Sequence, residues 1–64
     1  MAHKPDDTET YYNRGNAYYK EREYDKSIVA FSEVIKRKPD HPDAYYNRGN
    51  AYYVGVVFAK NSVI

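Results

Sequence analysis

The chain contains the stretch YYNRGNAYY twice, at Tyr11–Tyr19 and again at Tyr45–Tyr53. The tripeptide Lys-Pro-Asp precedes both copies, at 4–6 and 38–40, with the same offset of 34 residues. A nine-residue identity with a flanking tripeptide in one register does not arise by chance in a chain of 64 residues. An internal period of this length is typical of paired helices that stack as a solenoid. The repeat therefore predicts an all-α protein.

This pattern resembles the tetratricopeptide repeat (TPR), which has an aromatic residue, then Leu-Gly, then Tyr, later Ala-x3-Phe and finally Pro. Those positions are occupied here by Tyr11, Arg14, Gly15, Tyr18, Ser27, Phe31 and Pro39. Tyr replaces Trp at position 11, Arg replaces Leu at 14, and Ser replaces Ala at 27. The second copy supplies Tyr45, Arg48, Gly49 and Tyr52 and then loses the pattern. The resemblance thus covers about residues 4–53, one full repeat and the first helix of the next.

The resemblance implies one TPR-like domain over residues 1–64, with an antiparallel helix pair and a third helix in right-handed solenoid packing. We expect a frayed N-terminus at 1–7, the first repeat at 8–38, and the first helix of a second repeat at 42–54. Residues 55–64 are then a degenerate tail. The repeat register predicts a partial helix there, and the valine content predicts a strand about equally well.

Local signals give the bounds of the helices. We expect helices at about 8–21, 24–37 and 42–54, the first capped by Asp6, Asp7 or Thr8 and the third by Asp40, with Pro42 in its first turn. A Gly in a helix interior costs roughly 1 kcal/mol relative to Ala, so Gly15 and Gly49 predict the close approach of a neighbouring helix. The inner stripe predicted for the second helix consists of Tyr24, Ile28, Phe31 and Ile35, with Ser27 and Val34 beside them.

Charge and composition exclude several classes of protein. A net charge of +1, from 10 basic and 9 acidic residues, gives no electrostatic footprint for nucleic acid or an anionic membrane. The chain has no Cys and therefore no disulfide or thiolate metal site. Its polar N-terminus lacks the apolar core of a signal peptide, and the apolar run at 54–59 is too short to span a bilayer. We expect a soluble, cytoplasmic protein that binds neither nucleic acid nor membrane.

No catalytic constellation is recognisable, so we expect a protein that is not an enzyme and needs no metal or other cofactor. His3 and His41 lie outside the helix faces and lack the spacing of a metal-binding pair. The acidic cluster at 6–9 has neither the alternating ligands nor the central Gly of a calcium loop, and helix capping explains it better. The basic triplet at 36–38 is explained by helix termination, because cations favour the C-terminal end of a helix.

The resemblance to TPR implies a peptide or protein partner. In that family the first helix of each repeat lines a concave groove with the positions that flank its packing stripe. Carried onto this chain, those positions are Glu9, Tyr12, Asn16, Tyr19, Lys20, Asp43, Tyr46, Asn50 and Tyr53. Tyr presents a large rigid surface and Asn offers both a donor and an acceptor. The alternative is that these residues form only a solvated helix face.

Two sharper partner hypotheses have weaker support. Some TPR domains clamp the C-terminal carboxylate of chaperones with Lys and Asn, and Asn16 and Asn47 match the two Asn positions. Tyr12 stands where the Lys is expected, so the charge-assisted hydrogen bonds of such a clamp are missing. The last three residues, at 62–64, fit the Ser/Thr-x-hydrophobic terminus that PDZ domains capture by strand addition.

The incomplete second repeat predicts self-association. A single TPR helix pair cannot bury its hydrophobic face, and roughly three repeats are usually needed for a stable solenoid. The third helix and the tail should therefore expose an interaction surface made of Tyr45, Tyr52, Val56 and Phe58. We expect a homo-oligomer, formed as a dimer or by domain swapping. The alternative is a purely structural, oligomerising fragment of a longer TPR array; an RNA-binding helical repeat is disfavoured by the neutral charge.

Overall fold

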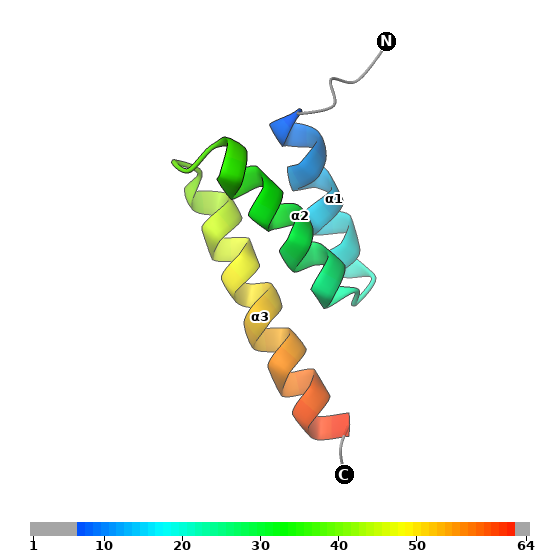
Figure 1. Cartoon of the computed structure of the whole chain (residues 1–64). Coiled ribbons are helices and arrows are strands. Elements are labelled where there is room, and N and C mark those ends of the chain that lie inside the picture. Colours follow the sequence, from blue (N-terminus) through cyan, green and yellow to red (C-terminus); the bar gives the residue numbers. More distant parts are fainter. Residues whose placement is uncertain (1–6, 63–64) are drawn as a thin grey trace.

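A computed structural model of the chain describes residues 7–62, and their side chains as far as Ala59. It contains three helices, α1 (Thr8–Lys20), α2 (Tyr24–Arg37) and α3 (Pro42–Ser62), and no strand within the described range (Figure 1). The prediction of an all-α fold is confirmed. The segment predicted to fray, apart from its last residue, lies outside the described residues. So do His3 and the final two residues of the chain.

The first helix begins after Asp7, which is the capping residue among the three candidates. The Asp7 carboxylate accepts hydrogen bonds from the backbone N–H of Glu9 at 3.1 Å and from Oγ1 of Thr10 at 3.0 Å. The helix ends at Lys20, and the next turn places Arg22 in the left-handed region with φ of 63°. The N–H of Glu23 then donates to the carbonyl of Tyr18 at 2.8 Å, which closes the turn and directs the chain into α2.

Helices α1 and α2 pack closely because Gly15 has no side chain. A Cβ at Gly15 would lie 2.6 Å from the Phe31 ring, and Oγ of Ser27 donates to the Gly15 carbonyl at 2.9 Å. The close approach predicted at this glycine is confirmed. The hydroxyl at the position where the TPR pattern has Ala therefore bonds the two helices together in the buried core.

The inner stripe predicted for α2 is only partly right. Phe31 is fully buried, but Tyr24, Ile28 and Ile35 are only half-buried. The other buried residues of α2 are Ser27, Ala30 and Val34. The reason is that α2 packs against two helices and so uses two faces. Ser27 and Phe31 meet Gly15 of α1, whereas Tyr24 and Ile28 lie beside residues of α3.

Helix α3 runs antiparallel to α2 and packs on it through small residues. Ala44 and Ala51 are fully buried, and Nη1 of Arg48 donates to Oγ of Ser32 at 3.1 Å. The predicted cap, Asp40, is wrong. Nδ1 of His41 accepts from the N–H of Ala44 at 3.2 Å, because Pro42 fixes the start of the helix and makes the residue just before it the N-cap.

Helix α3 also continues past its predicted end at 54 and reaches Ser62 without a turn (Figure 1). The predicted tail is therefore helical where the structure describes it, and the strand alternative is wrong. In the first copy the helix breaks where Arg22 has a positive φ, and the position 34 residues later is Val56. A β-branched residue is disfavoured in the left-handed region, so the chain stays helical.

The prediction of a close helix approach at Gly49 is wrong as well. A Cβ added at Gly49 would meet nothing within 4 Å among the described residues, and the glycine is exposed. No helix within the described range covers that side of α3, whereas α2 covers the equivalent side of α1. Despite its length, α3 is not apolar enough to cross a membrane, and neither is any other helix in the described part of the chain.

Candidate protein-interaction surfaces

The face formed by α1 and α3, called the concave face below, is held together by Asn47. Nδ2 of Asn47 donates to the Tyr12 hydroxyl at 3.0 Å and to Oδ1 of Asn16 at 3.4 Å. An amide nitrogen carries two protons, so these two bonds use both of them. The two helices are thereby fixed at a defined separation.

One hollow of the concave face is small and lined by amides. Its lining consists of Asn16, Tyr19, Asn47 and Asn50, and its volume is about 50 Å³. The Tyr19 ring is supported from behind by an edge contact with Tyr24, with ring centroids 5.5 Å apart. Amide groups can donate and accept hydrogen bonds, so this hollow suits a polar group such as a peptide bond.

The second hollow lies where α1 begins, beside the connection between α2 and α3. It has a volume of about 450 Å³, and its lining consists of Thr8, Glu9, Tyr12, Lys38, His41 and Asp43. The Tyr12 ring forms its floor, lying 5.8 Å from the Phe31 ring centroid and 5.1 Å from that of His41. Two carboxylates and one ammonium group surround this aromatic floor, and all three residues are exposed.

The structure thus brings together six of the nine residues predicted to bind a ligand. Asn16, Tyr19 and Asn50 line the small hollow, and Glu9, Tyr12 and Asp43 line the large one. The remaining three, Lys20, Tyr46 and Tyr53, line neither hollow. Tyr46 is 71% exposed and Tyr53 is 72% exposed, so both rings project from α3 into solvent.

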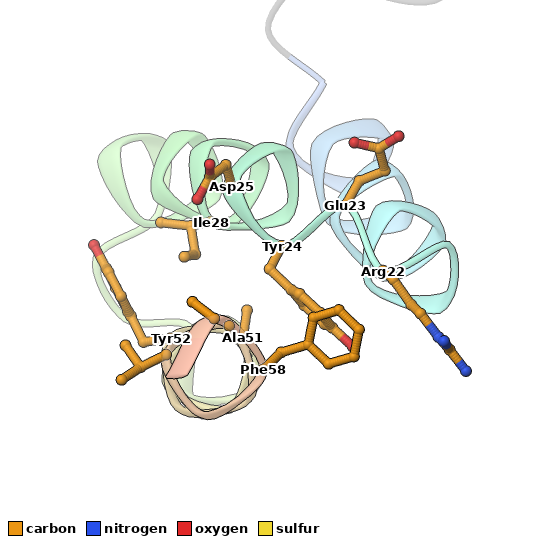
Figure 2. A pocket seen from close by; sticks show the side chains of 11 residues that line it. Arg22, Glu23, Tyr24, Asp25, Ile28, Ala51, Tyr52 and Phe58 are labelled. Carbon is orange, nitrogen blue, oxygen red and sulfur yellow. The ribbon is translucent and has the colours of Figure 1, made fainter. Parts of the chain in front are cut away.

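A different surface, the α3 stripe, consists of Tyr45, Gly49, Tyr52 and Val56. All four are exposed, with values of 45% for Tyr45, 51% for Tyr52 and 57% for Val56. Beside the stripe, α2 and α3 enclose a groove of about 440 Å³ (Figure 2). Its lining is formed by Arg22, Glu23, Tyr24, Asp25, Ile28, Ala51, Tyr52, Gly55, Val56, Phe58 and Ala59.

Phe58, also predicted to belong to the self-association surface, is exposed and lines this groove together with Tyr52 and Val56. Its ring lies against that of Tyr24, with centroids 6.4 Å apart in an edge arrangement. In Figure 2 Phe58 and Tyr52 point to different sides of α3. The aromatic contact helps to fasten the extended part of α3 to the start of α2.

Comparison with protein-family models gives a match to the tetratricopeptide repeat over residues 8–41, more than half of the chain. The chain belongs to the tetratricopeptide repeat family. Comparison with curated proteins and with solved structures gives no match. TPR domains are protein–protein interaction modules, so this chain is such a module. As a family, TPR domains are generally not catalytic. No group of three His, Cys, Asp or Glu residues within the described range is placed to hold a metal ion.

The residues predicted from the sequence to bind a ligand do not include Asn47, nor do they include Thr8, Lys38 and His41 of the large hollow. The residue equivalent to Asn47 in the first copy, Asn13, is exposed, so the repeat itself carries no signal for the role of Asn47. The carboxylate clamp would need the Asn47 amide protons, which already bond to Tyr12 and Asn16. This arrangement disfavours the clamp further.

Arg14 and Arg48, which occupy the Leu position of the TPR pattern, have different neighbours. The Arg48 guanidinium lies 5.7 Å from the Tyr45 ring centroid in addition to its bond to Ser32. Arg14 lines a second groove, between α1 and α2, together with Tyr11, Tyr18, Asp25, Lys26, Val29, Ala30 and Glu33. The guanidinium of Arg37, from the basic triplet, pairs with Glu33 and lies 4.6 Å from the Tyr11 ring centroid. These contacts are internal to the fold.

Proposed function

We propose that this TPR chain is a non-catalytic interaction module that binds an extended peptide on its concave face and self-associates through the α3 stripe. The observation that carries the first part is the bonding of Asn47 to Tyr12 and Asn16. It holds α1 and α3 in a fixed arrangement, so the two hollows exist before a ligand arrives. A site formed in advance spares a ligand the cost of ordering it.

Each part of the concave face has a role in this proposal. The small amide hollow at Asn16 and Asn50 receives a backbone amide of the peptide, and the large hollow over Tyr12 receives a side chain. The exposed rings of Tyr46 and Tyr53 close over the peptide from α3. Tyr is suited to this because it contributes a large contact area at a low cost in conformational entropy.

The test selects peptides from a random display library on the full chain and measures their affinities as synthetic peptides. We expect Tyr46→Ala or Asn50→Ala to weaken the selected peptides by about tenfold or more, as anchor residues do. Val29→Ala is the matched control, because Val29 is 62% exposed on α2 and lies outside the concave face. If the library yields no binder, or if all three variants weaken binding equally, the peptide site is overturned and the purely structural alternative is favoured.

The second part of the proposal is supported by the exposed aromatic and aliphatic side chains of the α3 stripe. Soluble monomers rarely leave a contiguous apolar surface uncovered, and such surfaces are usually interaction sites. A chain that associates only through this stripe, with no peptide ligand, is the structural alternative. Cytoplasmic location, and the lack of binding to nucleic acid or membrane, stay predictions from the sequence.

A further inference from the structure

We infer that α3 of a second copy, running antiparallel about a two-fold axis, covers the α3 stripe, with Tyr52 of each copy seated over Gly49 of the other. The inference rests on the self-association proposed above and adds the partner, its direction and its register. In such an isologous contact the same patch serves on both chains.

The stripe has the spacing of a helix–helix seam. Tyr45, Gly49, Tyr52 and Val56 follow intervals of four, three and four residues. A period of 3.5 residues keeps the side chains facing a second helix along its length, as in coiled coils. No charged residue occurs from 49 to 59, so burying this part of α3 removes no charged side chain of α3 from water.

The sizes of the side chains agree with an antiparallel pairing. When two copies of α3 are related by an axis midway between Gly49 and Tyr52, Gly49 faces Tyr52 of the second copy. In the same register Val56 faces Tyr45 of the second copy. A large residue thus meets a smaller one in every layer, which is the arrangement that packs without voids or clashes. A parallel pairing would put Tyr52 against Tyr52 and leave Gly49 opposite Gly49.

The fold already contains an example of the contact between a ring and a glycine. In the first copy of the nine-residue repeat, the Phe31 ring lies on Gly15, where a Cβ would come within 2.6 Å. The same nine residues surround Gly49, and nothing described lies within 4 Å of a Cβ placed there. The surface that accepts an aromatic ring in α1 is therefore present in α3 without one.

Charged residues at the two ends of α2 also favour the antiparallel pairing. Arg22, Glu23 and Asp25, with a net charge of −1 among them, line the end of the groove beside Val56. Because α2 runs antiparallel to α3, Lys36 lies toward the other end of the stripe. A two-fold axis across the stripe brings the acidic end of one chain toward Lys36 of the second copy. A parallel pairing would instead bring like charges together, which is unfavourable.

The first experiment measures the mass of the full chain by sedimentation equilibrium from about 5 to 500 micromolar, where association depends on protomer concentration. We expect a dimer that dissociates on dilution. Gly49→Gln should weaken the dimer by about tenfold or more while the monomer stays helical, because its side chain has room in the monomer and occupies the place of Tyr52 from the second copy. Tyr52→Gln should do the same. The control Val57→Gln, at an exposed position of α3 outside the stripe, should not.

The second experiment tests direction, using a chain that has no Cys of its own. Tyr45→Cys and Val56→Cys chains are mixed in equal amounts and oxidised. In the antiparallel register the mixed disulfide should predominate, because two copies of residue 45 would lie about 16 Å apart along the axis and cannot be bridged. A monomeric wild-type chain at the highest concentration would overturn self-association itself. A dimer that Gly49→Gln leaves intact, or that gives mainly homodisulfides, would overturn only this interface and favour another face or direction.

Discussion

The Phe31 ring lies against the backbone of Gly15, so closely that a Cβ at Gly15 would come within 2.6 Å of Cε1 of the ring. Phe31 is fully buried and cannot move aside without disturbing the core between α1 and α2. The Ser27 hydroxyl fixes the same point from α2 by its bond to the Gly15 carbonyl. This contact sets the distance between the first two helices.

The two glycines should therefore respond in opposite directions to the same substitution. Gly15→Ala should destabilise the fold by about 1–3 kcal/mol, because the added methyl overpacks the core. Gly49→Ala should stabilise it by roughly 0.5–1 kcal/mol, because the methyl meets open space and Ala is the better helix former. Urea unfolding followed by circular dichroism at low protein concentration measures both. Effects of the same sign would contradict the packing described here.

Asn47 should contribute to stability in a way that its counterpart in the first copy does not. Asn47→Ala removes the bonds to Tyr12 and Asn16, so we expect a loss of about 1–3 kcal/mol. Asn13→Ala is the matched control, because Asn13 is exposed, and its effect should stay within about 0.5 kcal/mol. Thermal unfolding of the two variants gives the comparison. Equal losses would show that the bonds between α1 and α3 contribute nothing.

The start of α3 should depend on His41 rather than on Asp40. His41→Ala removes the acceptor for the Ala44 N–H and should cost about 0.5–2 kcal/mol, as the loss of an N-cap does. His41→Asn supplies a new capping oxygen and should recover most of that loss, whereas Asp40→Ala should have little effect. The free energy of unfolding of the three variants decides between the two caps. A larger loss in Asp40→Ala than in His41→Ala would restore the original prediction.

A glycine at position 22 should stabilise the turn between α1 and α2. Arg22 has a φ of 63°, which costs a residue with a side chain roughly 1–2 kcal/mol. Arg22→Gly removes that cost, and after the entropic penalty of Gly we expect a net gain of about 0.5–1 kcal/mol. The neighbouring Glu21 has a negative φ, so Glu21→Gly should destabilise instead. Melting temperatures test the pair, and a loss in both variants would argue against a strained turn.

Much of the fold could be predicted because it depends on residues close together in the sequence. The start of α1 follows from the Asp7 cap, the end of α2 from Pro39, and the start of α3 from Pro42. The main feature that the sequence did not predict is the continuation of α3 as one helix beyond residue 54. Deciding it required knowing that the turn in the first copy needs a positive φ at Arg22, which Val56 cannot easily adopt.

The sequence by itself determined that the chain is a helical repeat and that its helices start where they do. Only the tertiary structure decided how the two identical stretches differ. Asn47 bonds to α1 while Asn13 faces solvent, and Gly15 is covered while Gly49 is open. Local propensity is the same for two identical stretches, so their different roles come entirely from the helices that pack, or do not pack, against them.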